Sequence, residues 1–347
     1  MIHFDNDYHA GAHPEVMRCL QQTNEEFAVG YGLDPYSEQA RKLIRKACEA
    51  PDALVQFLVG GTQTNAVVID ALLRHCEGVM AAETAHINVH ESGAIEFGGH
   101  KVLTLPSHFG KVKVEEVRHY LSDFYQDETY PHMVAPGMLY ITQPTELGTI
   151  YSLSELEALS ALCREYHIPL YLDGARLSYA LAADEADFTL ADIARLCDVF
   201  YIGGTKCGVM FGEAVVAREA SLLPRFFSLV KQHGALLAKG RLQGVQFSAL
   251  FTDDLYLRIA KEAVRKAKLI RDAFVKNGFR QTHVSPTNQQ FFVLPNKLID
   301  KLLENVSFEY WGARGETESM VRFVTDWSTS QQEVEQLVEL IEQGVIA

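Results

Sequence analysis

Short apolar runs alternate with stretches of helical periodicity from about residue 40 to residue 220. Residues 53–59 predict a buried strand that ends at Gly60 and Gly61, and residues 63–76 then place apolar side chains at helical spacing. Further strands are predicted at 79–82, 101–105, 139–142, 168–172 and 199–202, and further helices at 153–166 and 191–197. Strands that alternate with helices in this way predict a mostly parallel sheet covered on both faces.

The pattern changes in the last third of the chain. Residues 253–277 predict one long helix with Asp253 or Asp254 as its N-cap. The other elements predicted here are strands at 291–294 and 320–325, a helix near 295–305, and a last helix that opens with a capping box from Ser330 to Glu333. We therefore expect a large α/β domain over residues 1–245 and a small α+β domain over residues 246–347.

The composition is that of a globular protein and excludes several classes of partner. Hydrophobic residues make up 48% of the 347 positions and charged residues 22%, so the chain can bury a sizeable core. Lys and Arg number 31 against 45 Asp and Glu, a formal net charge of −14. Because nucleic-acid binders and proteins of anionic membranes need a basic surface, neither kind of partner is expected.

The cysteines and the N-terminal residues favour a cytoplasmic protein. Six cysteines are scattered without a C-x-x-C pair, a pattern that suits neither a disulfide framework nor a zinc site. The first seven residues have no basic or strongly apolar segment typical of a signal peptide, and no apolar run has the length of a membrane span.

A glycine pair marks the first candidate site. Gly60, Gly61 and Thr62 lie between a predicted strand and a predicted helix. Free N–H groups at such a helix start bind anions, and glycine lets a phosphate approach the backbone. An ordinary strand-to-helix turn explains the same residues equally well, and the motif matches neither a Walker loop nor G-x-G-x-x-G.

Two further candidates also follow predicted strands. Asp173 ends one strand with Arg176 three residues later, and Lys206 follows another strand and two glycines. Alone, each is compatible with a solvated turn. Ligands of parallel sheets bind beyond the carboxyl ends of the strands, so these groups and the glycine pair are expected in one site. A phosphate cradle, a carboxylate and a lysine are what pyridoxal 5′-phosphate requires.

Two histidine pairs offer a metal site only weakly. His86 and His90 are four residues apart, but the zinc-protease order His-Glu-x-x-His is not met and no third ligand is evident. His9 and His13 share the spacing, but Pro14 predicts that a helix begins just after them, so this pair is the weaker candidate. No metal is expected.

Several segments together carry a resemblance to a known family. They are Asp5-Asn6-Asp7-Tyr8, residues 31–35 (Tyr-Gly-Leu-Asp-Pro), residues 61–65 (Gly-Thr-Gln-Thr-Asn), Ala85-His86, residues 172–177 (Leu-Asp-Gly-Ala-Arg-Leu) and Gly204-Thr205-Lys206. In this order, from residue 2 to the end, the chain resembles the threonine aldolases, which belong with the β-eliminating lyases among fold-type I pyridoxal-phosphate enzymes. The resemblance implies a large domain with a seven-stranded, mostly parallel sheet and a small C-terminal α+β domain.

The resemblance also implies roles for single residues. The cofactor-binding positions would be Gly61, Thr62, His86, Asp173, Arg176, Thr205 and Lys206. Lys206 matches the lysine that holds the cofactor as a covalent imine, and Asp173 the partner of the pyridine nitrogen. His86 matches the histidine that stacks on the ring, and it is a candidate base.

Substrate and assembly are implied in the same way. Arg176 and Arg322 resemble the groups that hold the substrate carboxylate, which places the site between the two domains, and Asn6 stands where many relatives carry serine. The family implies a homodimer or homotetramer with sites at the interface, where Tyr31 and a basic residue within 239–241 would reach a neighbouring cofactor.

One departure bears on the reaction. Where many threonine aldolases carry a histidine over the substrate hydroxyl, this chain has Glu146, a candidate base if burial raises its pKa. The leading interpretation is retro-aldol cleavage of L-threonine or L-allo-threonine to glycine and acetaldehyde. The alternatives are β-elimination from an amino acid with an aromatic or thiol leaving group, and a non-catalytic phosphate-ligand binder.

Overall fold

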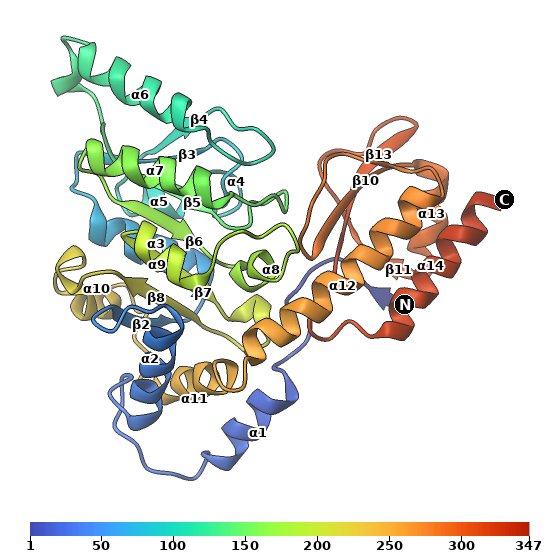
Figure 1. Ribbon diagram of the computed structural model, residues 1–347, viewed down its shortest axis with the longest axis horizontal. Helices are drawn as coiled ribbons and strands as arrows, with labels where there is room; N and C mark the ends of the chain where they lie inside the picture. Colours follow the sequence, from blue (N-terminus) through green and yellow to red (C-terminus); the bar gives the residue numbers. More distant parts are fainter. Residues whose placement is uncertain (347) are drawn as a thin grey trace.

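The larger part of the molecule is built on a seven-stranded sheet (Figure 1). The computed structural model describes residues 1–346, with side chains through residue 343. In sheet order the strands are β2 (Leu54–Leu58), β8 (Glu213–Ala217), β7 (Val199–Gly203), β6 (Leu170–Asp173), β5 (Ala135–Thr142), β3 (Glu77–Ala82) and β4 (Val102–Leu105). β8 is antiparallel to both neighbours and the other pairs are parallel, so the predicted mostly parallel sheet is confirmed.

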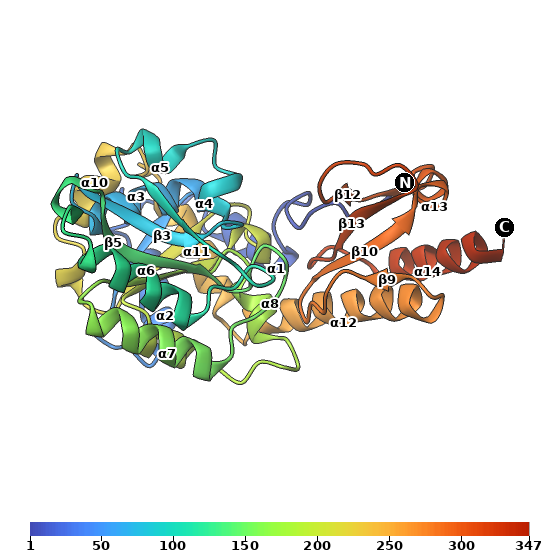
Figure 2. The ribbon, with the colours of Figure 1, turned by 90° about the horizontal axis from the view of Figure 1, so that it is seen from above.

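Helices cover both faces of this sheet (Figure 2). On one face lie α3 (Gly61–Leu72), α4 (His86–Val89), α5 (Ala94–Phe97) and α10 (Phe226–Gln232). On the other lie α6 (Val114–Gln126) and α7 (Leu153–Glu165), with α9 (Leu190–Leu196) packed on α7. Because water reaches neither face, strands β6, β7 and β8 are buried at every position, which explains their continuous apolar runs.

Three helices lie beside the β2 edge, where α11 (Arg241–Leu250) contacts both α1 (Pro14–Gln22) and α2 (Pro35–Ala47). The remaining short elements of this larger part are the helix α8 (Leu177–Leu181) and three 3-10 helices, η1 (Tyr130–His132), η2 (Thr205–Cys207) and η3 (Ala220–Leu222). Within residues 1–346, none of the helices combines the length and apolar character that crossing a bilayer requires.

The smaller part carries a four-stranded antiparallel sheet. Its order is β12 (Glu309–Tyr310), β13 (Glu318–Val324), β10 (Gln289–Pro295) and β9 (Arg280–Gln281), with α13 (Asn296–Leu303) and α14 (Gln331–Ile346) packed beside it. The first strand of the chain, β1 (Ile2–His3), pairs with β11 (Val306–Ser307), and Phe4 is buried in this smaller core. The chain thus starts among its C-terminal elements, as the blue and red ends of Figure 1 show.

Helix α12 (Leu255–Lys276) joins the two cores (Figure 1). Ile259 and Val264 on its first half pack in the larger core, whereas Ile270 and Phe274 on its second half pack in the smaller one. The division expected at residues 245 and 246 stays a prediction.

The structure differs from the sequence predictions at several places, among them β5, β8 and the start of α12. β5 begins at Ala135 rather than at residue 139, because its first residues pair with β3 through a register shift that no periodicity reveals. β8 was not predicted. Asp254 precedes α12 but does not cap it with its side chain, because its backbone is left-handed, with φ of 53°.

Candidate active site

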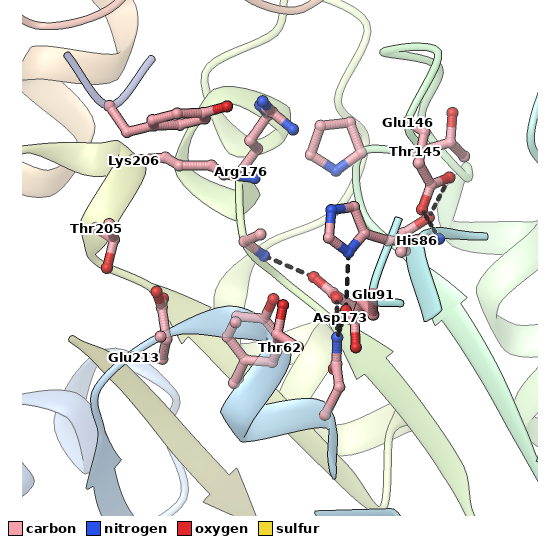
Figure 3. Close-up of a pocket in the computed structure, with 18 of the residues that line it drawn as sticks. Thr62, His86, Glu91, Thr145, Glu146, Asp173, Arg176, Thr205, Lys206 and Glu213 are labelled. Carbon is pink, nitrogen blue, oxygen red and sulfur yellow. Dashed lines mark hydrogen bonds and ion pairs between the residues drawn. The ribbon is translucent and has the colours of Figure 1, made fainter. Parts of the chain in front are cut away.

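A cavity of about 290 Å³ lies at the carboxyl ends of the central strands (Figure 3). Its wall includes these residues singled out from the sequence: Gly61, Thr62, His86, Glu146, Asp173, Arg176, Thr205 and Lys206. They come from five separate stretches of the chain, and the parallel sheet brings them together because its strands end at one edge.

The start of helix α3 forms one side of the cavity. Gly60 is its N-cap, and among the described side chains none caps the first turn with a hydrogen bond. The N–H groups of Gly61 and Thr62 are therefore free for an anion, which the helix dipole also favours. A Cβ atom on Gly61 would lie 3.2 Å from the Tyr201 hydroxyl oxygen, so glycine keeps this entrance open.

A buried polar network fixes the carboxylate of Asp173. Its Oδ2 accepts hydrogen bonds from Tyr140 (2.7 Å) and from Asn65 Nδ2 (3.0 Å), and its Oδ1 accepts one from Ala175 N–H (3.0 Å). The Asn65 amide also donates to Glu91 Oε1 (2.8 Å), which in turn meets His86 Nδ1 at 2.8 Å. The network therefore holds both the carboxylate and the imidazole in place, as the dashed lines of Figure 3 show.

Lys206 enters the cavity from the opposite side. It lies in η2 immediately after β7, and its Nζ is 6.0 Å from the centre of the Tyr8 ring. Loss of hydration lowers the pKa of Lys206, and the nearby charge of Arg176 adds to this effect. An amine with a lowered pKa has a larger fraction in the neutral form that attacks carbonyl groups.

Arg176 is held by an ion pair with Asp7. Its Nε and Nη2 donate to the two Asp7 oxygens at 2.6 and 2.9 Å. Burial would raise the pKa of Asp7, but the charges of Arg176 and Lys206 outweigh it and the pKa lies below its ordinary value. The guanidinium of Arg176 thus borders the cavity in a fixed orientation.

Glu146 faces the cavity from the loop after β5. Its Oε1 accepts a hydrogen bond from His86 N–H (2.8 Å) and its Oε2 one from Thr142 (3.2 Å). Burial raises the pKa of Glu146 to about 6, although hydrogen bonds from backbone N–H groups, including that of His86, oppose the shift. A carboxylate with this pKa suits proton transfer near neutral pH.

Comparisons with known proteins agree with this geometry. The family model described as "Beta-eliminating lyase" matches residues 7–296. This chain belongs to that family. The low specificity L-threonine aldolase of Pseudomonas aeruginosa is 31% identical over 337 residues, covering 96% of this chain and 95% of that protein. The fold-type I resemblance is therefore confirmed, and the chain is a pyridoxal-phosphate-dependent lyase by family.

Solved structures extend the comparison. The threonine aldolase of Leishmania major superposes with a TM-score of 0.96 at 39% identity, covering 99% of this chain and 100% of that one. An aspartate aminotransferase of Thermus thermophilus superposes with a TM-score of 0.72 at 14% identity, covering 99% and 91% of the two chains, which shows a shared fold. The predicted fold class is confirmed.

The cavity of this beta-eliminating lyase has the groups that the family's cofactor needs. The uncapped start of α3 offers backbone N–H groups to a phosphate. Asp173 presents a hydrogen-bonded carboxylate, and Lys206 presents an amine whose pKa is lowered. The residues therefore fit pyridoxal phosphate on structural grounds.

Asn6 and Arg322, which were also singled out from the sequence, are not among the residues that line this cavity. Asn6 borders a separate cavity with His3 and His9, and its Oδ1 accepts a hydrogen bond from Tyr8 N–H (3.0 Å). Arg322 on β13 donates to Gln289 (2.8 Å) and pairs with Glu309, and its guanidinium lies 4.8 Å from the Trp311 ring centre.

Sequence reasoning assigned no role to several residues that line the cavity. They include Tyr8, Asn65, Glu91, Tyr201 and Glu213. Asn65 lies four residues after Gly61, so helical spacing was a signal that it faces the same side. Glu213 is a carboxylate at the head of an apolar run, which was a signal of a buried acid at a strand end.

The ion pair between Asp7 and Arg176 also ties the N-terminal segment to the larger domain. We expect Asp7→Ala to lower the free energy of unfolding by about 3 kcal/mol, because it leaves a largely buried guanidinium without its partner. Asp7 has a depressed pKa, so its contribution is present above the ordinary value of 3.8 and is lost as the pH falls below it. Denaturant unfolding at pH 7 and pH 3 measures both effects. A change of equal size at the two pH values would contradict this account.

Proposed function

We propose that this protein cleaves the Cα–Cβ bond of L-threonine or L-allo-threonine, giving glycine and acetaldehyde, with pyridoxal phosphate held at Lys206. The observation that carries the proposal is the single cavity lined by Lys206, Asp173 and Glu146. The threonine aldolase relatives, which match over nearly the whole chain, support the same reaction.

The residues divide the binding of the cofactor among them. Gly61, Thr62 and Thr205 would hold the phosphate, Asp173 would be the partner of the pyridine nitrogen, and the Lys206 amine would be the covalent attachment point. The cofactor, when bound, supplies an electron sink for the negative charge that develops at the substrate Cα. The His86 ring, oriented by Glu91, covers one face of the site.

Two arginines are proposed to hold the substrate carboxylate. Arg176 is oriented by Asp7 and borders the cavity. Arg322 belongs to the smaller domain, and its Nε is buried without a hydrogen-bond partner among the described residues. Asn6 is proposed to contact the substrate from the N-terminal segment. A carboxylate held between two domains fixes the rotation about the N–Cα bond and so selects the bond that breaks.

Glu146 is proposed to accept the proton of the substrate β-hydroxyl as the Cα–Cβ bond breaks. The ionised form is needed, and the pKa of about 6 leaves it mostly ionised at pH 7. His86 is the second candidate for this proton. Its backbone N–H already binds Glu146, so the two groups lie on the same side of the cavity.

We expect Glu146→Gln to lower the rate of threonine cleavage by about 10²-fold, because glutamine cannot accept the proton. The wild-type rate should fall as the pH drops through about 6, and the variant should lose this dependence. Rates measured from pH 5 to pH 8 test both points. Glu96→Gln on an exposed part of α5 is the matched control. An unchanged acid limb in Glu146→Gln would assign the proton to another group, with His86 the next candidate.

Exposed apolar side chains near residue 30 bear on the assembly of the protein. Phe27, Val29 and Leu33 are exposed apolar side chains in one segment, and Phe27 has a relative exposure of 106%. Tyr31 lies in the same segment, and the Nζ atom of Lys231 is 4.5 Å from the centre of the Tyr31 ring. Such a surface is typical of an interface, so we propose a homodimer or homotetramer. A cytoplasmic location is proposed from the six cysteines, which are all unpaired. Neighbouring copies would contribute Tyr31 and a basic residue of 239–241 to each site.

The direct test supplies L-threonine and L-allo-threonine separately to cofactor-loaded protein and measures glycine and acetaldehyde. Equal amounts of both products would support the proposal and would rank the two isomers. Pyruvate and ammonia in their place would mean β-elimination. Failure of borohydride to attach the cofactor to the protein would instead indicate a non-catalytic binder of phosphate ligands.

A further inference from the structure

Glu213 is a buried acid in the cavity wall to which the proposed reaction gives no role. It is 3% exposed and begins β8. In the register of the sheet it lies opposite Leu58 on β2 and opposite Gly203 on β7. Those two strands lead directly into the glycine pairs 60–61 and 203–204. Glu213 therefore lies between the start of α3 and the turn that presents Lys206.

The contacts of Glu213 point to the same place. Its Oε2 accepts a hydrogen bond from Gly204 N–H (3.0 Å), and Thr205, the next residue along the chain, lines the same cavity. Figure 3 shows its carboxyl group below Thr205, on the side of the cavity where Thr62 lies. Thr62 and Thr205 are proposed phosphate ligands. The acid is therefore built into the phosphate end of the site.

The surrounding charges do not neutralise an ionised Glu213. From η2, Lys206 favours the ionised form, whereas Asp173 on β6 opposes it. The other titratable groups that interact with it are Tyr171 on β6, Tyr201 on β7, Cys207 in η2 and Tyr256 on α12. These phenols and this thiol are buried, which raises their pKa, so they are neutral at ordinary pH. Burial raises the pKa of Glu213 itself to about 8.

A phosphate bound at this end of the cavity would favour the protonated form of Glu213 further. A phosphate monoester carries between one and two negative charges near pH 7, and an ionised carboxylate beside it in a buried site would repel it. A protonated carboxyl group avoids the repulsion and adds an O–H donor to the N–H groups of α3. The remaining carboxyl oxygen still accepts the hydrogen bond from Gly204.

We propose that Glu213 is a phosphate ligand in its neutral form: its carboxyl group carries a proton and donates a hydrogen bond to the cofactor phosphate, so that cofactor binding in alkaline solution takes up one proton from solvent. The proposal rests on the assignment of pyridoxal phosphate to this cavity. It goes beyond that assignment because it fixes the protonation state of a residue outside the Lys206, Asp173 and Glu146 set.

The sign of the pH dependence follows from linkage. Below about pH 8 the acid already holds its proton in the free protein, so binding takes up none at Glu213. Above about pH 8 the proton must be captured on binding, and the dissociation constant should rise about tenfold per pH unit. Glu213→Gln is neutral at every pH and keeps an N–H donor, so it should lack this component.

The experiment uses 4′-deoxypyridoxine 5′-phosphate, which has the phosphate and ring but no aldehyde to react with Lys206. Its dissociation constant is measured by calorimetry from pH 7 to pH 9.5 for wild type, Glu213→Gln and the exposed control Glu128→Gln. Runs in two buffers of different ionisation enthalpy count the protons taken up. At pH 9 we expect nearly one more proton for wild type and for Glu128→Gln than for Glu213→Gln, and about tenfold tighter binding by Glu213→Gln than by wild type.

Two outcomes separate this proposal from the one on which it rests. If pyridoxal phosphate and its analogue bind wild type at no pH, the cofactor site itself is wrong. If they bind, but wild type and Glu213→Gln take up equal numbers of protons, Glu213 gains no proton on binding and the proposal is overturned. If Glu213→Gln fails to fold, infrared spectra of the wild-type protein test the proposal instead. A new band of a protonated carboxyl group on binding at pH 9 supports the neutral-acid role of Glu213, and the absence of this band overturns it.

Discussion

Lys206→Ala should lose threonine cleavage by roughly 10⁴-fold, the largest effect expected from a single substitution in this chain. The Lys206 amine is the proposed attachment point of the cofactor. Its burial and the nearby charge of Arg176 both lower its pKa. No other lysine lines the cavity in the described chain, so no neighbouring amine can take over. Acetaldehyde release, followed with a coupled alcohol dehydrogenase, measures the loss.

A second readout separates a chemical defect from a folding defect. Borohydride treatment of cofactor-loaded wild type should add the mass of the reduced cofactor to the peptide that contains Lys206, and the variant should gain none. Lys301→Ala, at an exposed position on α13, is the matched control and should behave as wild type. Full turnover by Lys206→Ala would remove the basis of the proposed reaction.

Asp173→Asn should lower the rate by about 10²- to 10³-fold, because it removes a preorganised charge but keeps the size of the side chain. The loss should appear in kcat, since the charge matters most when the substrate carbon becomes negative. The hydrogen bonds from Tyr140 and Asn65 hold the carboxylate in one orientation. The oxygen of an asparagine at 173 can still accept the hydrogen bonds of Tyr140 and Asn65, but its NH2 group cannot accept the one from Ala175 N–H, so the thermal midpoint should fall modestly.

The measurement compares kcat, KM and the visible spectrum of the cofactor-loaded variant with those of wild type. Asp52→Asn is the control, because Asp52 is exposed and remote from the cavity wall. A change in KM with unchanged kcat would mean that Asp173 contributes to binding alone. The role as partner of the pyridine nitrogen would then be wrong.

Local signals were sufficient for the elements that carry Asp173 and Lys206. Each residue follows a short apolar run that can only be a buried strand in an alternating pattern, and the structure has β6 and β7 at these places. Because parallel strands end at one edge, their neighbourhood in space could be expected without coordinates. The same reasoning applies to Gly61 and Thr62 at the start of α3.

Other features depended on contacts between distant segments. β8 was missed because the chain from residue 207 to residue 217 gives no periodicity that sets its direction, and only pairing with β2 and β7 makes it antiparallel. The partner of Arg176 lies 169 positions away at Asp7. The positions of Arg322 and Asn6 outside the main cavity likewise depend on how the smaller domain and the N-terminal segment pack.

The sequence by itself determined the alternation of strands and helices, the family resemblance, and the residue types at the strand ends. These are local properties, since side-chain periodicity and turn residues act over a few positions. Only the tertiary structure decided which charges are buried together: the pairing of Arg176 with Asp7, and the placement of Glu213 between two glycine turns. Protonation depends on burial and on neighbouring charge, and both arise from segments that meet only when the chain is folded.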